Sequence, residues 1–287
     1  MLSFSVVWNN KILLKNMRYS RFYLPELTLS RFRSALIRRI NDIPHNLAWK
    51  FSGNGKQNFQ NLRKYKDIHK GKRCFILGNG PSLAKMDISH LQGEITFGLN
   101  RIYLLFEKMP FRPNYYICIN ELVLEQYANE ILDLEMPKFL NWNRRHLFLE
   151  SRSDINFLRL SLGLTDYFGT NPLNALSSGG TVTHVALQLA FFMGFSEVVL
   201  LGVDHRFTIS GTPNQTELRT SEKDENHFHP AYFPKGSKWQ LPDLLRSEHA
   251  YSIADQAFSL AGRKVYDATV NGNCPVFEKR EFLSFFC

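Results

Sequence analysis

Long apolar runs are missing from this chain of 287 residues. No segment approaches the roughly eighteen consecutive apolar residues that a membrane-spanning helix needs. The longest run, Val185 to Phe195, is interrupted by Gln188. Met1 to Val7 has neither a basic start nor a cleavage site close behind it, so we expect no signal peptide. Because 44% of the residues are hydrophobic, the chain can bury a core, and we expect a globular protein of the cytoplasm.

Cysteines and several well-known motifs are also scarce or absent. The four cysteines have no metal-like or redox-like spacing, so we expect reduced thiols and no bound metal: Cys74, Cys118, Cys274 and Cys287. The pattern Gly-x-x-x-x-Gly-Lys-Ser/Thr does not occur, which argues against a P-loop NTPase. No motif that reads DNA or RNA is present, so we expect no nucleic-acid partner despite the net charge of +9.

Acidic residues are few in the N-terminal part. Nine Lys/Arg lie between Lys11 and Lys50 against only Glu26 and Asp42, so this segment holds seven of the nine surplus positive charges. Four apolar residues recur there at helical spacing, with arginines between them: Leu29, Phe32, Leu36 and Ile40. We favour the interpretation that this helix packs its apolar stripe on the core. The alternative is that residues 11–50 lie on an anionic membrane surface. In the second case the protein would sit on the inner face of the cytoplasmic membrane.

Short apolar runs alternate with helical patterns after residue 65. The expected strands are Cys74 to Leu77, Ile95 to Leu99, Tyr115 to Ile119, Lys138 to Asn141, Val198 to Val203 and Lys264 to Tyr266. The expected helices are Leu122 to Leu134, Thr181 to Met193 and Ser247 to Leu260. This alternation predicts an α/β, Rossmann-like fold with a mostly parallel sheet and helices on both faces.

The expected organisation has two parts. Residues 1–65 form a basic, partly helical N-terminal extension that ends in a polar linker or turn, Ser52 to Asn58. Residues 66–287 form a nucleotide-binding, catalytic domain. Within that domain, Ser210 to Asp224 is polar and without periodicity, so we expect a mobile loop or lid.

Two glycine turns are the strongest functional signal. The first follows an apolar run and has the sequence Gly78-Asn79-Gly80-Pro81-Ser82-Leu83. The second, Ser177-Ser178-Gly179-Gly180-Thr181, opens an apolar helix. Because each stands before an expected helix, we expect uncovered backbone N–H groups that bind a phosphate. Either turn could instead be purely structural.

Polar residues follow several of the expected strands, where parallel sheets bind ligands. They are the pairs Asn100-Arg101 and Asn120-Glu121 and the tripeptide Asp204-His205-Arg206. An arginine at position 206 could neutralise a departing phosphate. One of His227 and His229 could take a proton from an acceptor hydroxyl. Arg206 could instead form an ion pair. The two histidines could instead bind a divalent metal together with His205 and Asp224.

Together these motifs resemble the bacterial branch of the MptE-like 6-hydroxymethylpterin diphosphokinase domain family, over about residues 66 to 285. The order of elements is also similar to bacterial CMP-sialic-acid-dependent sialyltransferases of the lipooligosaccharide type and to Maf flagellin glycosyltransferases. The residues that carry the resemblance are Gly78 to Leu83, Ser178 to Thr181, Gly202 to His205 and Asn226 to Phe228.

The resemblance implies roles for individual residues. Asn79 and Gly80 would contact the nucleotide phosphate and ribose, and a histidine would be the base, with His227 preferred to His229. Arg206 stands where the sialyltransferases have a tyrosine that supports the leaving phosphate. The full set of nucleotide- and donor-binding candidates is Gly78, Asn79, Gly80, Ser82, Asn100, Asn120, Ser177, Ser178, Gly179, Gly180, Thr181, Asp204 and His205.

Three functions follow as hypotheses. The first is a metal-independent, inverting glycosyltransferase that uses a CMP-activated nonulosonic sugar and a glycan or lipid-linked acceptor in surface glycan synthesis, without a cofactor. The second is a pterin diphosphokinase that uses ATP and Mg²⁺, although the Asp-x-Asp-Gly element of the archaeal members is absent here. The third is a non-catalytic nucleotide- or glycan-binding module. Whether the chain forms a homo-oligomer is left open.

Overall fold

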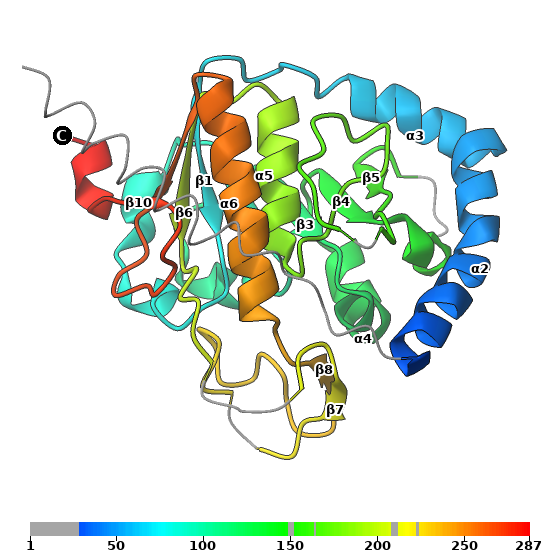
Figure 1. Ribbon diagram of the computed structural model, residues 1–287. Coiled ribbons are helices and arrows are strands. Elements are labelled where there is room, and N and C mark those ends of the chain that lie inside the picture. The colour runs from blue at the N-terminus through cyan, green and yellow to red at the C-terminus, as the bar shows by residue number, and fades with distance from the viewer. Residues whose placement is uncertain (1–28, 149–151, 164, 208–211, 222–223) are drawn as a thin grey trace, which may run out of the picture.

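A parallel sheet forms the centre of the molecule. The computed structural model describes residues 29–148, 152–163, 165–207, 212–221 and 224–287 (Figure 1). Within them the sheet has eight strands in the order β10-β9-β6-β1-β2-β3-β4-β5, and every neighbouring pair is parallel. The strands are β1 (Arg73–Leu77), β2 (Thr96–Leu99), β3 (Tyr115–Cys118), β4 (Lys138–Asn141), β5 (Ile155–Leu158), β6 (Glu197–Leu201), β9 (Lys264–Asp267) and β10 (Glu278–Lys279). The predicted α/β fold is confirmed.

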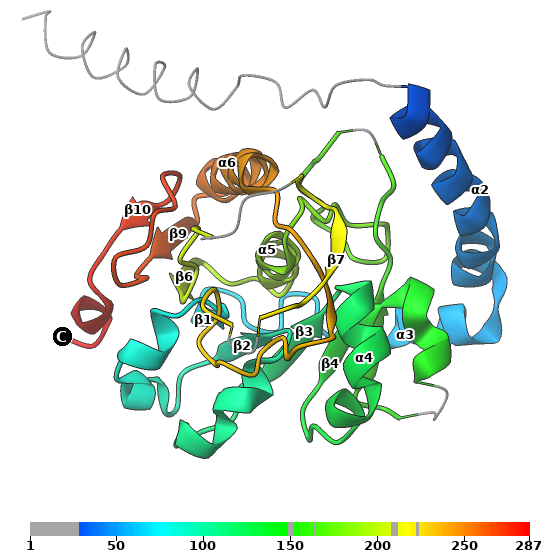
Figure 2. The ribbon, with the colours of Figure 1, turned by 90° about the horizontal axis from the view of Figure 1, so that it is seen from below.

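Helices cover both faces of this sheet. The α-helices are α2 (Leu29–Phe51), α3 (Gly53–Arg63), α4 (Glu121–Leu132), α5 (Val182–Phe192) and α6 (Leu244–Leu260). Short 3₁₀ helices are η1 (Leu83–Lys85), η2 (Ile88–Leu91), η3 (Ile102–Lys108), η4 (Trp142–Leu147) and η5 (Phe282–Phe285). Helices α5 and α6 lie side by side over one face (Figures 1 and 2). Helix α4 and several 3₁₀ helices pack on the other.

Alternating side chains of β1 show why the strands are continuously apolar. Cys74 and Ile76 point into the cluster beneath α5 and α6, whereas Phe75 and Leu77 point into the cluster beneath α4. All four are fully buried. A strand that is covered on both faces needs apolar residues at every position, as parallel sheets do.

The order of the strands creates a switch point at the middle of the sheet. From β1 the chain adds β2, β3, β4 and β5 in one direction, and then returns to place β6 on the other side of β1. Connections on the two sides of a switch point diverge and leave a crevice at the carboxyl ends of the strands. Gly78 follows β1 and Gly202 follows β6, so both stand at this crevice.

Two regions differ from the sequence-based expectation of loops. The segment Ser210 to Asp224 contains strand β7 (Thr216–Leu218), which pairs in antiparallel fashion with β8 (Lys238–Gln240). The expectation of a loop throughout is therefore wrong, while residues 208–211 and 222–223 lie outside the described residues. A three-residue strand with two exposed side chains carries too little pattern to be recognised.

Of the linker or turn expected at Ser52 to Asn58, the linker is wrong because α3 begins at Gly53, whereas the chain does turn at Ser52. Ser52 caps this helix, and its hydroxyl oxygen accepts a hydrogen bond from the Gly55 N–H at 3.0 Å. A side chain at position 55 would lie 2.3 Å from the carbonyl oxygen of Trp49, so glycine permits the sharp corner between α2 and α3. Asn58 pairs with the edge strand β5 through two hydrogen bonds to the Phe157 backbone, of 3.0 and 2.8 Å.

Helix α2 packs on η4 and the core with the side opposite to the predicted stripe. Trp49 is buried in the same core cluster as Cys74, whereas Leu36 and Ile40 are about half exposed. The favoured interpretation, an apolar stripe on the core, is therefore wrong for these two residues. The side chains of Leu29 and Phe32 lie outside the described part of the chain.

Membrane spans and thiols can both be examined in the described residues. Among the described residues no helix is long and apolar enough to cross a membrane. All four cysteines are free thiols, and Cys287 is the exposed one. Burial raises the pKa of the Cys118 thiol to about 12, so this group stays protonated.

Candidate functional site

A cavity of about 160 Å³ opens at the switch point of the sheet. Turns after β1, β2 and β6 line it, together with the starts of α5 and α6 and the segment that contains His227. The lining residues are Gly78, Asn79, Gly80, Leu99, Asn100, Gly180, Thr181, Val182, Thr183, Gly202, Val203, Asp204, His205, Arg206, Phe207, Asn226, His227, Pro242, Leu244, Ser247 and Tyr251. The two glycine turns, about a hundred residues apart in sequence, thus meet at one site.

The first glycine turn uses its amides within the protein. Gly78 N–H donates to the Leu201 carbonyl at 2.7 Å, and Gly80 N–H donates to the Gly202 carbonyl at 2.8 Å. The expectation that these two amides are uncovered is therefore wrong. The chain then enters η1, a 3₁₀ helix of three residues, so no α-helix begins there either.

Glycine is nevertheless required at both positions of this turn. A side chain at position 78 would lie 2.4 Å from the Gly202 carbonyl oxygen, and one at position 80 would lie 1.8 Å from Oδ2 of Asp204. The glycines let the turn after β1 lie directly against the turn after β6. The missing side chains thus serve the close packing of two turns.

Asp204 holds these two turns together. Its Oδ2 accepts a hydrogen bond from the Ser82 hydroxyl at 2.6 Å, and its Oδ1 accepts one from the Ser82 N–H at 3.1 Å. Both residues are buried, at 5% exposure each. Asp204 lines the cavity whereas Ser82 does not, so Ser82 supports a residue of the lining from behind.

Two asparagines present acceptor atoms at the site. The side-chain oxygens of Asn79 and Asn100 are buried and accept no hydrogen bond from any described residue. Both residues line the cavity, from the ends of β1 and β2. A buried acceptor without a partner costs free energy, so these atoms fit hydroxyl or amino donors of a ligand.

The second glycine turn contributes through its last residues. Gly179 and Gly180 have φ of 55° and 73°, a backbone conformation that favours glycine. Thr181 then caps α5, since its hydroxyl oxygen accepts from the Thr183 N–H at 3.2 Å. Gly180, Thr181 and Thr183 line the cavity at the positive end of this helix of 11 residues, which favours an anion.

His227 stands at the edge of the cavity with its orientation set by two neighbours. Its Nδ1 is 2.9 Å from Oδ2 of Asp224, and its ring stacks on Tyr232 with 3.9 Å between centroids and 2° between planes. Because a carboxylate only accepts hydrogen bonds, Nδ1 carries the proton, and Nε2 of the neutral ring is the acceptor.

Asp224 is held as a carboxylate. Burial alone would raise its pKa, but the hydrogen bond and charge of His227, the N–H of Asn226 and the charge of Arg219 outweigh burial and lower the pKa. Oδ1 of Asp224 accepts from that Asn226 N–H at 2.9 Å. The pair can therefore stabilise a positive charge that develops on the imidazole.

The family of the chain follows from a family model described as 6-hydroxymethylpterin diphosphokinase MptE-like, which matches residues 49–210. The match covers more than half of the chain. The chain belongs to the MptE-like family. The matched region includes both glycine turns and the end of β6, whereas Asp224 and His227 lie beyond it.

Other comparisons with known proteins are distant. No curated protein matches the MptE-like chain. Among solved structures, the MAf glycosyltransferase from Magnetospirillum magneticum AMB-1 is 15% identical, with a TM-score of 0.47. The similarity covers 81% of this chain and 39% of that chain. The chain therefore spans well under half the length of that solved structure.

Several predicted site residues of this MptE-like chain lie outside the cavity. Asn120 instead caps α4, where its side-chain oxygen accepts from the N–H groups of Leu122 and Val123 at 3.0 and 3.3 Å. The Ser177 hydroxyl donates to Asp166 at 2.8 Å. Ser178, Gly179 and His229 are likewise absent from the lining.

All three residues of the tripeptide after β6 line the cavity, and two of them also bond other parts of the chain. Asp204 bonds Ser82, as described above, and Nε2 of His205 lies 2.9 Å from a Glu248 carboxylate oxygen. His205 adopts a φ of 54°, which turns the chain at the rim. Arg206 is exposed and lines the cavity.

Arg101 was predicted only as a polar residue at a strand end, without a role of its own. Its buried guanidinium donates to the carbonyl oxygens of Ala231 and Tyr232 and stacks over the Tyr127 ring, with 3.6 Å to the centroid. Its backbone N–H donates to the Tyr232 hydroxyl at 3.3 Å. Arg101 thereby holds the ring against which His227 stacks. The available signal was the polar pair Asn100-Arg101, which follows the buried strand β2.

The described residues offer no ready site for a metal ion. They contain no group of three His, Cys, Asp or Glu side chains that could hold one. Of the described residues that line the cavity, Asp204 alone carries a carboxylate, and both of its oxygens accept from Ser82. This donor set does not fit Mg²⁺, which binds carboxylates with free oxygen atoms.

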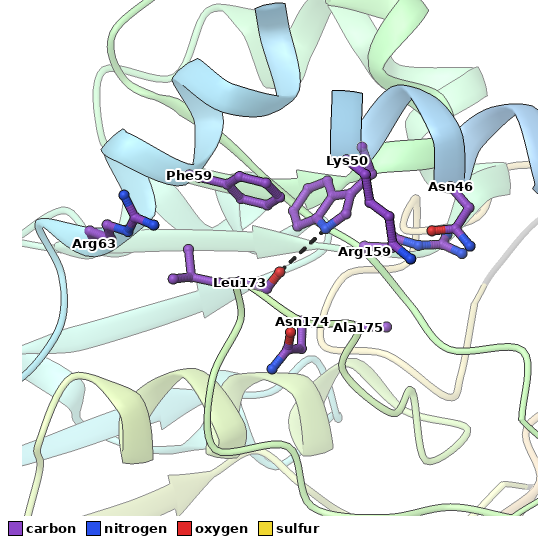
Figure 3. A pocket seen from close by; sticks show the side chains of 9 residues that line it. Asn46, Lys50, Phe59, Arg63, Arg159, Leu173, Asn174 and Ala175 are labelled. Carbon is purple, nitrogen blue, oxygen red and sulfur yellow. Dashed lines mark hydrogen bonds between the residues drawn. The ribbon is translucent and has the colours of Figure 1, made fainter. Parts of the chain in front are cut away.

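A second, larger cavity of about 460 Å³ lies beneath α2 and α3. Arg159 contributes a guanidinium to it, but Asp42 already pairs with that group at 3.1 and 2.5 Å. Arg63 lies well apart from Lys50 and Arg159 (Figure 3). The cations therefore do not converge on one point, and the smaller cavity remains the candidate site.

Proposed function

We propose that this chain is a metal-independent, inverting glycosyltransferase that takes a sialic-acid-like sugar from a CMP donor and acts in surface glycan synthesis. The observation that carries the proposal is the Asp224–His227 pair beside a cavity with unpartnered asparagine oxygens. A nucleotide-sugar is already activated by its phosphate. The protein then needs a base, support for an anion and exclusion of water.

The proposed reaction uses His227 as the base. Nε2 takes the proton of an acceptor hydroxyl while the hydroxyl oxygen attacks the anomeric carbon from the side opposite to the phosphate. The bond between that carbon and the phosphate oxygen breaks, and its electron pair leaves with CMP. Asp224 stabilises the imidazolium that forms, and Arg206 neutralises the charge on the departing phosphate.

The donor has a proposed orientation in the cavity. Oxygens of Asn79 and Asn100 accept from hydroxyl or amino groups of the nucleotide, and the start of α5 at Thr181 faces its phosphate. The cavity, at about 160 Å³, is smaller than the roughly 300 Å³ of typical small-molecule sites. The donor therefore extends beyond it, past the exposed Arg206.

Calorimetry with CMP, UDP, NAD and ATP with Mg²⁺ tests the nucleotide. We expect CMP to bind most tightly, and we expect its affinity to be independent of Mg²⁺. Tighter binding of ATP with Mg²⁺ would contradict the proposal in favour of a diphosphokinase. Failure of all four to bind would contradict both.

Substitution of the two histidines tests the base. His227→Ala should lower turnover by about 10²–10⁴ because proton transfer is lost. His229→Ala is the matched control, since His229 lies two residues away and outside the cavity lining. Equal losses in the two variants would remove His227 from the proposed role.

Pyrophosphate transfer is the second candidate, because the family description names a 6-hydroxymethylpterin diphosphokinase. That reaction would require ATP and Mg²⁺ and would release AMP, whereas the glycosyltransferase would release CMP without a metal. A non-catalytic binding module would release neither. Measuring the released nucleotide with and without a chelator therefore separates the three hypotheses.

A further inference from the structure

The side of α2 that faces away from the sheet is unusually apolar. Its large side chains are between 49% and 70% exposed: Leu36, Ile37, Ile40, Ile43, Leu47 and Phe51. We call these six residues the outer face of α2. They account for six of the fourteen large hydrophobic side chains that are exposed among the described residues. One helix thus carries a continuous apolar surface, and such a surface marks an interaction site.

Helical geometry places these residues on one side. Most of them follow one another at spacings of three or four, which brings them onto the same face at 3.6 residues per turn. Asp42 and Trp49 lie on the opposite side. Trp49 is buried in the core, and its indole N–H donates to the Leu173 carbonyl at 3.3 Å.

Contacts along the inner side fix this orientation. Asp42 binds the buried guanidinium of Arg159 through both carboxylate oxygens. The indole N–H of Trp142 donates to the His45 carbonyl at 2.9 Å. Helix α2 cannot turn its outer face to the sheet without breaking these bonds. Figure 2 shows α2 along the periphery of the molecule.

The charge of α2 indicates which surface the outer face meets. Arg33, Arg39 and Lys50 are exposed, whereas the one carboxylate of the helix, Asp42, is neutralised on the inner side by Arg159. The outer face is therefore apolar with a cationic border. This combination complements a bilayer that contains anionic lipids.

We propose that the outer face of α2 binds the surface of an anionic phospholipid bilayer. The apolar side chains would enter the boundary between headgroups and acyl chains, and the arginines would contact the lipid phosphates. A second copy of the chain fits less well, because cations would face cations in such a dimer. Pro44, which is exposed within the same stretch of α2, also disfavours a regular coiled coil. The proposal does not depend on the proposed reaction.

Sedimentation with lipid vesicles tests the proposal on the full chain. We expect binding to vesicles that contain phosphatidylglycerol, little binding to phosphatidylcholine alone, and release by added salt. The double variant Ile40→Gln with Leu47→Gln should weaken binding by about tenfold or more, since half-exposed aliphatic side chains are lost. Leu260→Gln, which alters a leucine of α6 that is 90% exposed, is the matched control and should bind like the native chain.

Charge removal gives a second readout. Arg33→Gln with Arg39→Gln should lower the affinity for anionic vesicles about thirtyfold, at about fivefold for each charge. Thermal unfolding should stay unchanged in all variants, because the altered side chains are exposed. Equal binding to neutral and anionic vesicles, or full binding by the Ile40/Leu47 variant, would overturn the proposal. So would a dimer in light scattering that this variant converts to a monomer.

Discussion

Asp224→Asn offers a sharp test of the proposed base, because the structure dictates how the new side chain must lie. In the native protein Oδ1 of Asp224 accepts from the Asn226 N–H, and Oδ2 accepts from Nδ1 of His227. An asparagine must keep its oxygen toward Asn226 and therefore turns its NH₂ group toward His227. The imidazole must then accept at Nδ1 and carry its proton at Nε2.

This change removes the base without removing the histidine. Nε2 can no longer take a proton from an acceptor hydroxyl, so we expect a loss in turnover of about 10²–10⁴, equal to about 3–5 kcal/mol in the barrier. The assay is the release of CMP from a CMP-sugar donor, with CMP affinity measured alongside by calorimetry. Because Asp224 does not line the cavity, the affinity for CMP should not change.

A double variant completes the test. If Asp224 acts through His227, then Asp224→Asn combined with His227→Ala should be no slower than His227→Ala alone. Additive losses would mean that Asp224 has a separate role. Turnover of Asp224→Asn at the native level would refute the proposed tautomer and, with it, the assignment of His227 as the base.

Three further predictions concern stability. Gly80→Ala should destabilise the fold by about 3 kcal/mol in chemical unfolding, because the new Cβ would lie 1.8 Å from Oδ2 of Asp204. Gly53→Ala is the control and should be neutral, since a Cβ at position 53 meets nothing within 4 Å. Asn120→Ala should cost about 1 kcal/mol through loss of the α4 cap, with CMP affinity unchanged. Burial lowers the pKa of His184 from 6.5 to about 4, so the unfolded state binds its proton first as the pH falls. The free energy of unfolding should therefore drop by roughly 3 kcal/mol between these pH values, and His184→Gln should remove that drop.

Six of the eight strands of the central sheet were predicted because their signal is local, whereas β5 and β10 were missed. Strands such as β1 and β6 are short apolar runs bounded by glycine, and parallel strands need apolar residues on both faces. The antiparallel β7–β8 pair and the two-residue β10 could not be predicted, since their side chains are mostly exposed. Helix α3 was missed because glycine and asparagine are poor helix formers, and here tertiary contacts of Asn58 outweigh that propensity.

The candidate site was predictable in place but not in detail. Strand ends and glycine turns indicated the correct rim, and Asn79, Asn100 and His227 do line one cavity. The partner of a polar side chain depends on distant parts of the chain, which a sequence does not display. Ser82 and Asp204 are 122 residues apart, yet they bond one another. Nothing in the local pattern separated such supporting residues from those that face the cavity.

The amide of Asn58 has a consequence for aggregation. An open sheet has two borders at which a foreign strand could add itself through backbone hydrogen bonds. At β5, Asn58 occupies both the N–H and the carbonyl of Phe157, in the middle of that strand. At the far border, β10 is only two residues long. Polymerisation by strand addition is thereby opposed at each end of the sheet.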